Sequence, residues 1–307
     1  MPDGDQYGQT DEFFSSAGVR CAATVYRPTA PHARVPVIVM ASGFGATRGL
    51  RLPAYAERFA AAGYAVVLFD YRCFGDSEGE PRQLLDVRSQ LEDWRAAIRF
   101  ARSLDVVDSD RVIAWGTSFA GGHLLTIAGS GERLAAVIAQ VPHVSGPAAV
   151  RATGLRQALR LAPPALADLA GSLFRRPPRY VSAVGPENAV AALAAPGAMA
   201  AFERLLAESS IQRGDYPETV AARILIKIGF YSPARHARKI TCPTLIQVAA
   251  SDNIAPAAAA AKTAEKIPES TLLRYECGHF GPYIHPDFPR VIADQLEFLT
   301  ETVPVGP

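Results

Sequence analysis

The stretch RVIAWGTSFAGGH (111–123) places one serine, Ser118, between a short apolar run and a run of small residues. The residues before it predict a buried strand over 111–115. Those after it predict a helix over 118–129, closed by Gly129 and Gly131. A tight strand-to-helix turn would need such small residues whatever its purpose. The alternative is that the turn exists to present Ser118 as a nucleophile.

Similar apolar runs and helical patterns alternate along most of the chain. Alternation of this kind predicts an α/β fold, in which helices cover both faces of a mainly parallel sheet. The expected strands are 11–16, 19–27, 35–41, 64–70, 111–115, 134–141, 243–250 and 270–275, and the expected helices are about 50–62, 87–101, 118–129, 256–266 and 287–301.

The alternation stops after Pro142 and returns near residue 238. We therefore predict one domain formed by 1–142 and 238–307, with an inserted helical segment at 143–237 in which pairs of prolines mark breaks. Residues 143–239 contain 13 Lys and Arg against 6 Asp and Glu, which gives +7. Two interpretations remain open: a solvated helical surface, or attraction of an anionic part of a substrate such as a phosphate.

Composition narrows the function classes. The net charge of the 307 residues is +1, so nothing global indicates a nucleic-acid or membrane partner. No apolar run reaches the roughly 18 residues that a membrane-spanning helix needs, and the polar start does not resemble a secretory signal. Four scattered cysteines indicate reduced thiols, and we expect a cytoplasmic protein without a metal or other cofactor.

A serine nucleophile needs a base, and a histidine base needs an orienting carboxylate. His279 follows the last predicted strand, at the edge of a parallel sheet where active sites gather. Asp252 directly follows the strand before it. The order Ser118, Asp252, His279 is the one expected for this kind of sheet. Asp215 and Asp287 are placed less well, and His279 or Asp252 could instead cap a helix.

An acyl-transfer site also needs donors for the oxyanion. We expect the backbone N–H of Phe119, at the start of a helix, and that of Phe44, in the glycine-containing loop ASGFGATRG (41–49). His143, which opens the insertion, and Tyr231 are candidates for substrate contact.

These segments together resemble the α/β-hydrolase superfamily, in its serine esterase and peptidase-like branches. SGFGATRG resembles the oxyanion loop, FDYRCFGDSEGEPR (69–82) the D-x-R-G-x-G-x-S segment, and GTSFAGG the nucleophile elbow. CPTLIQVAASDNIAP resembles the segment that carries the acid, and GHFGPY the histidine loop. The resemblance implies a mainly parallel eight-stranded sheet with a helical cap at 143–237. It also implies catalytic roles for Ser118, Asp252 and His279.

Three positions depart from that pattern. Ser42 stands where histidine is usual, which would loosen the oxyanion loop, and Cys73 and Ala120 each replace a glycine. None of these changes removes a catalytic group. Segment 69–82 is expected to buttress the site.

The sequence therefore predicts a serine hydrolase that cleaves a carboxylic ester of a small-molecule acyl substrate. It leaves the oligomeric state open, with a homodimer as one option. Alternatives are a thioester, an amide or a carbon–carbon bond cleaved by the same three residues. Another is a binding protein on a hydrolase scaffold.

Overall fold

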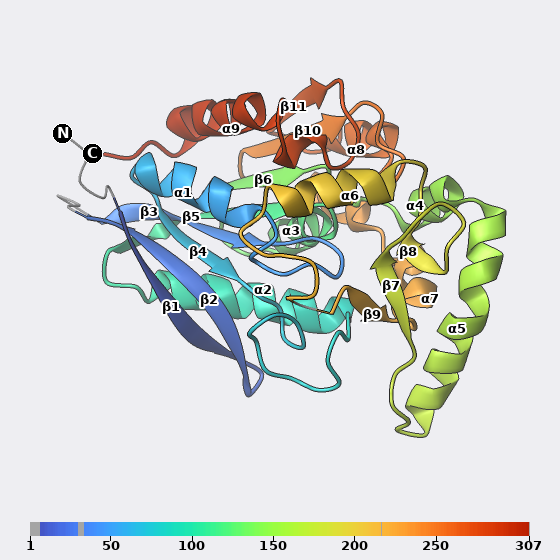
Figure 1. Cartoon of the computed structure of the whole chain (residues 1–307). Coiled ribbons are helices and arrows are strands. Elements are labelled where there is room, and N and C mark those ends of the chain that lie inside the picture. Colours follow the sequence, from blue (N-terminus) through green and yellow to red (C-terminus); the bar gives the residue numbers. More distant parts are fainter. Residues whose placement is uncertain (1–6, 30–33, 216, 307) are drawn as a thin grey trace.

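The computed structural model describes residues 7–29, 34–215 and 217–306, so the first six residues of the polar start lie outside the described residues. Its centre is an eight-stranded sheet (Figure 1) in the order β1-β2-β4-β3-β5-β6-β10-β11. The strands are β1 (Tyr7–Ser16), β2 (Val19–Pro28), β3 (Val35–Ala41), β4 (Ala65–Phe69), β5 (Val107–Thr117), β6 (Ala136–Gln140), β10 (Thr244–Ala249) and β11 (Ser270–Tyr275).

The sheet is parallel except at one edge, where β2 runs antiparallel to both β1 and β4. Every residue of β3 is buried, and its side chains alternate between two apolar clusters. Val37 and Val39 join the cluster on one face, and Ile38 and Met40 join the cluster on the other. A strand covered on both faces accounts for the continuous apolar run in the sequence.

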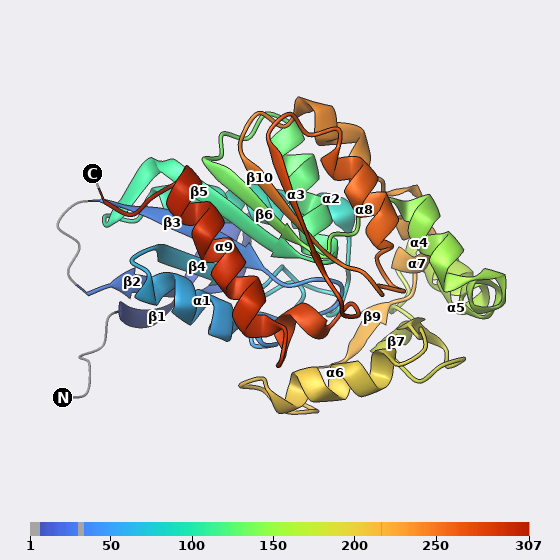
Figure 2. The ribbon, with the colours of Figure 1, turned by 90° about the horizontal axis from the view of Figure 1, so that it is seen from above.

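Helices supply the covering layers. On one face pack α2 (Val87–Arg102), α3 (Phe119–Gly129) and α8 (Ala257–Ala264). On the other face, α1 (Leu52–Ala61) lies beside α9 (Phe288–Thr302) (Figure 2). The predicted α/β class and mainly parallel eight-stranded sheet are confirmed. Strand β5 starts four residues before the predicted 111.

The insertion, residues 143–237, leaves the sheet after β6 and returns before β10. Its helices are α4 (Gly146–Thr153), α5 (Leu155–Leu173), α6 (Ala198–Ala207) and α7 (Ile224–Lys227), followed by the 3-10 turns η1 (Ile228–Phe230) and η2 (Pro233–Lys239). A further 3-10 turn, η3 (Gly281–Tyr283), lies in the histidine loop.

The insertion is helical over most of its elements, as expected, but helices do not form all of it. It also contains a small sheet in the order β8-β7-β9, formed by β7 (Tyr180–Val184), β8 (Ala191–Leu193) and β9 (Thr219–Ala221). Strands of three to five residues are too short to show an alternating pattern in the sequence. The pairs of prolines were expected to mark breaks, but α5 continues through Pro163 and Pro164. The carbonyls that lose a partner there belong to Leu159 and Arg160, which are exposed to water.

One buried ion pair ties the insertion together. The Asp168 carboxylate, on α5, accepts hydrogen bonds from the Arg223 guanidinium at 2.8 and 3.0 Å, and from the backbone N–H groups of Arg179 and Arg223. Burial would raise the pKa of Asp168, but these donors lower it below its ordinary value. The pair joins α5 to the segments on both sides of the small sheet.

Asp168→Ala should lower the free energy of unfolding by about 3–5 kcal/mol, because the Arg223 guanidinium is left buried without its counter-charge. Urea denaturation followed by circular dichroism measures the change. Asp110→Ala is the matched control, because it breaks an ion pair with Arg133 in which both side chains are more than three-quarters exposed. Equal effects of the two substitutions would contradict the anchoring role.

Candidate active site

Ser118 lies in the one-residue turn between β5 and α3, with φ 53° and ψ −116°. This conformation is rare for a residue with a side chain and is held by its surroundings. The Ser118 N–H donates to the carbonyl of Gln140 on β6 at 2.8 Å. A Cβ on Gly116 would lie 2.8 Å from the backbone carbon of Ala120, and one on Gly43 would lie 2.9 Å from the Ser118 Cβ. The small residues are therefore a steric requirement of the turn.

His279 and Asp252 meet Ser118 at the carboxyl edge of the sheet. The His279 Nε2 lies 3.1 Å from the Ser118 Oγ, and its Nδ1 lies 2.6 Å from the Asp252 Oδ2. The two loops follow β11 and β10, which are parallel neighbours, so their ends come together. His279 and Asp252 are both almost completely buried. The three residues form one continuous hydrogen-bonded row.

Neither alternative role for these two residues fits the geometry. The N-cap of α8 is Pro256 and that of α9 is Asp287, so neither Asp252 nor His279 caps a helix. The second oxygen of Asp252 accepts the N–H groups of Ile254 and Ala255 at 2.8 and 2.7 Å, which orients the carboxylate toward His279. Asp215 instead accepts the N–H of Gln212 within the insertion.

The backbone amides of Phe44 and Phe119 adjoin Ser118. Among the described residues neither N–H has a hydrogen-bond acceptor, as an oxyanion donor requires. The two rings pack edge to face with their centroids 5.8 Å apart. That contact joins the loop after β3 to the start of α3.

The loop after β3 is held from two sides. The hydroxyl of Ser42 donates to the carbonyl of Ala46 at 2.7 Å, so serine itself bridges the loop where a loosening was expected. The carboxylate of Asp70, 2% exposed, accepts the Arg48 N–H at 2.7 Å and pairs with the Arg48 guanidinium. Segment 69–82 thus buttresses the loop. Cys73, at φ 69°, occupies a left-handed conformation that glycine adopts more easily.

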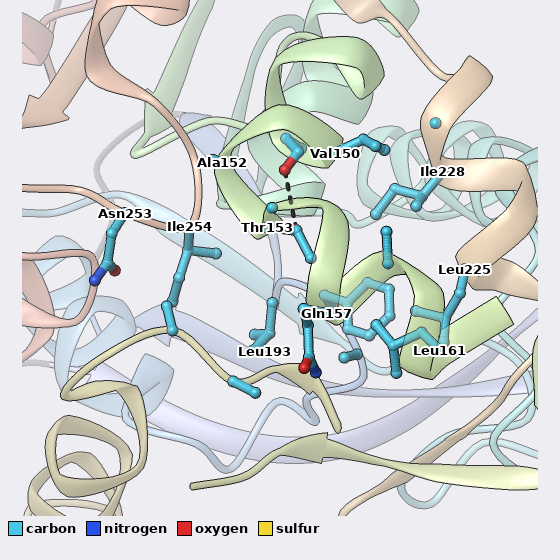
Figure 3. Close-up of a pocket in the computed structure, with 18 of the residues that line it drawn as sticks. Val150, Ala152, Thr153, Gln157, Leu161, Leu193, Leu225, Ile228, Asn253 and Ile254 are labelled. Carbon is cyan, nitrogen blue, oxygen red and sulfur yellow. Dashed lines mark hydrogen bonds between the residues drawn. The ribbon is translucent and has the colours of Figure 1, made fainter. Parts of the chain in front are cut away.

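A cavity of about 1010 Å³ is lined by Ser118 at one place and by many residues of the insertion at others. Figure 3 shows part of its wall. Its wall is mainly apolar, and much of it comes from Val150, Leu161, Leu193, Leu225, Ile228 and Ile254. Apart from His143, Arg156 and Glu187 are the ionisable residues among those described as lining it. The excess positive charge of the insertion therefore does not converge on the cavity, which counts against the anion-attraction interpretation.

The two residues predicted to contact substrate lie in different surroundings. His143 lines the cavity, and its N–H donates to the Ser118 carbonyl at 2.9 Å. Tyr231 is absent from the described cavity wall. Its hydroxyl instead lies 2.7 Å from Nδ1 of His123 and 3.1 Å from the Thr126 hydroxyl. The Tyr231 hydroxyl is therefore directed at α3, and contact between Tyr231 and a substrate stays a prediction.

His123, on α3, is completely buried. Burial lowers the pKa of His123 to about 3 and that of His143 to about 4, so both rings are neutral at neutral pH. The Nε2 of His123 lies 3.0 Å from the Gln90 side-chain oxygen. With Tyr231, His123 therefore connects the end of the insertion to α3 and α2.

A second set of buried polar side chains lies under the serine turn, and no pattern in the sequence predicted that these side chains would meet. The Thr117 hydroxyl bonds the hydroxyl of Tyr283, from the histidine loop. Gln140 accepts from the Tyr55 hydroxyl at 2.9 Å and from the Gln295 amide at 3.1 Å. Scattered amides and hydroxyls become one network only when the strand ends and α9 are brought together.

Among the described residues no cluster of His, Cys, Asp or Glu could hold a metal ion, and no helix is long and apolar enough to cross a membrane.

A mainly parallel eight-stranded sheet with a serine turn after β5 defines the α/β-hydrolase class of fold. Comparison with known families agrees: the model of the X-Pro dipeptidyl-peptidase (S15) family matches residues 17–285. The chain belongs to this family.

Three relatives illustrate the range of the similarity. The quorum-quenching protein AidA of Acinetobacter baumannii is 45% identical over 96% of this chain and 95% of its own length. The thiohydrolase aneE of Aspergillus aculeatus is 34% identical over 43% of this chain and 40% of its own. The crystal structure of the α/β hydrolase GrgF from a Penicillium species superposes with a TM-score of 0.77, 24% identity, and coverage of 96% of this chain and 99% of that one.

The buried imidazole of His123 predicts acid sensitivity. Below pH 6.5 the unfolded chain binds a proton on this residue that the native state, with a pKa of about 3, does not bind. Stability is therefore lost as the pH falls from 6.5 toward 3, by about 2 kcal/mol at pH 5. His123→Gln should remove this loss, so that urea denaturation at pH 7 and pH 5 shows a correspondingly smaller difference. The same difference in wild type and variant would contradict the assignment.

Proposed function

We propose that this protein is a serine hydrolase that cleaves a carboxylic ester through an acyl-enzyme on Ser118. The observation that carries the proposal is the hydrogen-bonded row from Ser118 through His279 to Asp252, which opens onto an apolar cavity. A buried imidazole held between a hydroxyl and a carboxylate is the arrangement that activates serine. The apolar wall suits the acyl part of the substrate.

In the first half-reaction, the Nε2 of His279 takes the Ser118 proton while Oγ forms a bond to the ester carbonyl carbon. Asp252 stabilises the resulting imidazolium. The N–H groups of Phe44 and Phe119 donate to the oxyanion. When this intermediate collapses, the bond from carbon to the alcohol oxygen breaks, and His279 gives its proton to the departing alcohol.

In the second half-reaction, water replaces the alcohol. His279 takes a proton from the water, whose oxygen forms a bond to the acyl carbon. The bond from that carbon to Ser118 Oγ then breaks, and the serine recovers the proton from His279. The products are a carboxylic acid and an alcohol, and the enzyme returns to its starting state.

Two other kinds of substrate bond, a thioester and an amide, need to be tested separately. The similarity to a thiohydrolase favours a thioester as the second candidate. The family's description as a dipeptidyl-peptidase raises an amide. A dipeptidyl substrate has a charged amine, which needs carboxylates to bind it. Glu187 is the single carboxylate among the described residues of the cavity wall. The apolar cavity therefore favours an acyl ester over a peptide.

Ser118→Ala should lower kcat by a factor of about 10⁴ or more, because the acyl-enzyme can no longer form. The assay is hydrolysis of p-nitrophenyl esters from acetate to dodecanoate, beside the matching acyl-CoA thioesters and Ala-Pro-p-nitroanilide. Covalent labelling by a fluorophosphonate probe, lost in the variant, checks the nucleophile independently. Folded wild type that neither labels nor turns over any of these substrates would indicate a binding protein instead.

The cavity also predicts how acyl length is selected. Leu161 on α5 is buried and lines the cavity, whereas Leu166 on the same helix is 55% exposed and is not part of the described wall. Leu161→Trp should shift the preferred p-nitrophenyl ester to a shorter acyl chain, because the larger ring occupies part of the cavity. Leu166→Trp is the matched control and should leave the profile unchanged. Identical profiles for wild type and Leu161→Trp would place the acyl chain elsewhere.

A further inference from the structure

Helix α5 turns a row of leucines toward solvent. Four of them are 55–79% exposed: Leu155, Leu159, Leu166 and Leu173. At about 100° per residue these four positions fall within an arc of about 40° on the helix surface. Phe174, next to Leu173 in the chain, and Phe230, which lines the same cavity as Leu155, are also more than 70% exposed. We call these six residues the leucine face. Single exposed leucines are normal on a protein surface, whereas a group of this size indicates an interaction site.

The segment that carries this face is positively charged. Residues 146–179 contain six arginines and one acid, Asp168, which gives +5. Asp168 is buried and already paired with Arg223. All six arginines are exposed, and none forms an ion pair with any residue in the described part of the chain: Arg151, Arg156, Arg160, Arg175, Arg176 and Arg179. Arg160 donates to the Asn188 side-chain oxygen at 2.7 Å, beside the exposed Glu187, and Arg156 lines the cavity with Glu187. Arg175 and Arg176, which follow Leu173 and Phe174 in the chain, are therefore the cations that accompany the leucine face.

The leucine face adjoins the mouth of the cavity. Helix α5 forms the outer edge of the insertion, away from the central sheet (Figures 1 and 2). Leu155 and Phe230 belong to the leucine face and also line the cavity, as does the 42% exposed Val150. An apolar surface thus continues from the outside of α5 into the space that leads to Ser118.

We propose that the leucine face docks this protein on an anionic lipid surface, with the leucines among the acyl chains and the arginines at the lipid phosphates. Amphipathic helices of this composition bind at such an interface without crossing it. A second copy of the chain is the less suitable occupant, because it would bring two surfaces of +5 together. The whole-chain charge of +1 gave no hint of this partner, because acidic residues elsewhere balance the insertion. The proposal extends the proposed function without depending on it, since docking needs no turnover.

The test is co-sedimentation of the full chain with vesicles of phosphatidylcholine alone, or of phosphatidylcholine with 30% phosphatidylglycerol. The Ser118→Ala form is run in parallel, so that binding and hydrolysis are scored separately. We expect binding to the anionic vesicles that weakens at high salt. Arg175→Glu with Arg176→Glu should weaken it at least ten-fold, since each arginine near an anionic surface contributes a factor of about five. Leu166→Ser with Leu173→Ser should weaken it similarly.

None of these four residues lies in the described cavity wall, so hydrolysis of a soluble short ester should be unchanged in both double variants. Phe13→Ser, at a 48% exposed position on β1, is the matched control and should bind vesicles like wild type. Failure of wild type to bind anionic vesicles would overturn the proposal. So would a dimer, seen by light scattering, that Leu166→Ser with Leu173→Ser dissociates, because the leucine face would then be a subunit interface.

Discussion

The structure depends on a close backbone approach at one point, where β5 passes through Ser118 into α3. Gly116 and Ala120 let the strand and the helix nearly touch, and Gly43 lets the neighbouring loop pass beside the serine. Larger side chains at the glycines would push the elements apart. That displacement would relax the strained Ser118 backbone and move its hydroxyl away from His279. The geometry of the candidate site is therefore a consequence of packing two elements at contact distance.

The parallel sheet brings the remaining groups to the same place. Loops after β3, β5, β10 and β11 all lie at one edge, because the carboxyl ends of parallel strands coincide. Beneath that edge the buried polar side chains satisfy one another, with Asp70 holding the loop of Phe44 and Thr117 bonding Tyr283. Such partners keep the reacting groups oriented before any substrate arrives.

The insertion has a different physical character from the sheet domain. Most of its buried apolar residues join the two clusters that cover the central sheet, a buried Asp168–Arg223 pair holds it together, and its longest helix leaves leucines in water. The same helix contributes Leu161 to the cavity and Leu166 to the outer surface. The substrate selection and the lipid docking that we propose would therefore use different sides of α5. The first follows from what the helix covers, and the second from what it leaves uncovered.

The sequence by itself determined the alternation of strands and helices, the serine turn, and the order of Ser118, Asp252 and His279, because each is a local pattern or lies at a strand end. Only the tertiary structure decided that Tyr231 faces His123 instead of the cavity. It alone also showed that short strands interrupt the insertion and that Leu161 is buried whereas Leu166 is exposed. The physical reason is that long-range packing determines side-chain direction and the burial of charge, and a pattern of neighbouring residues does not contain that information.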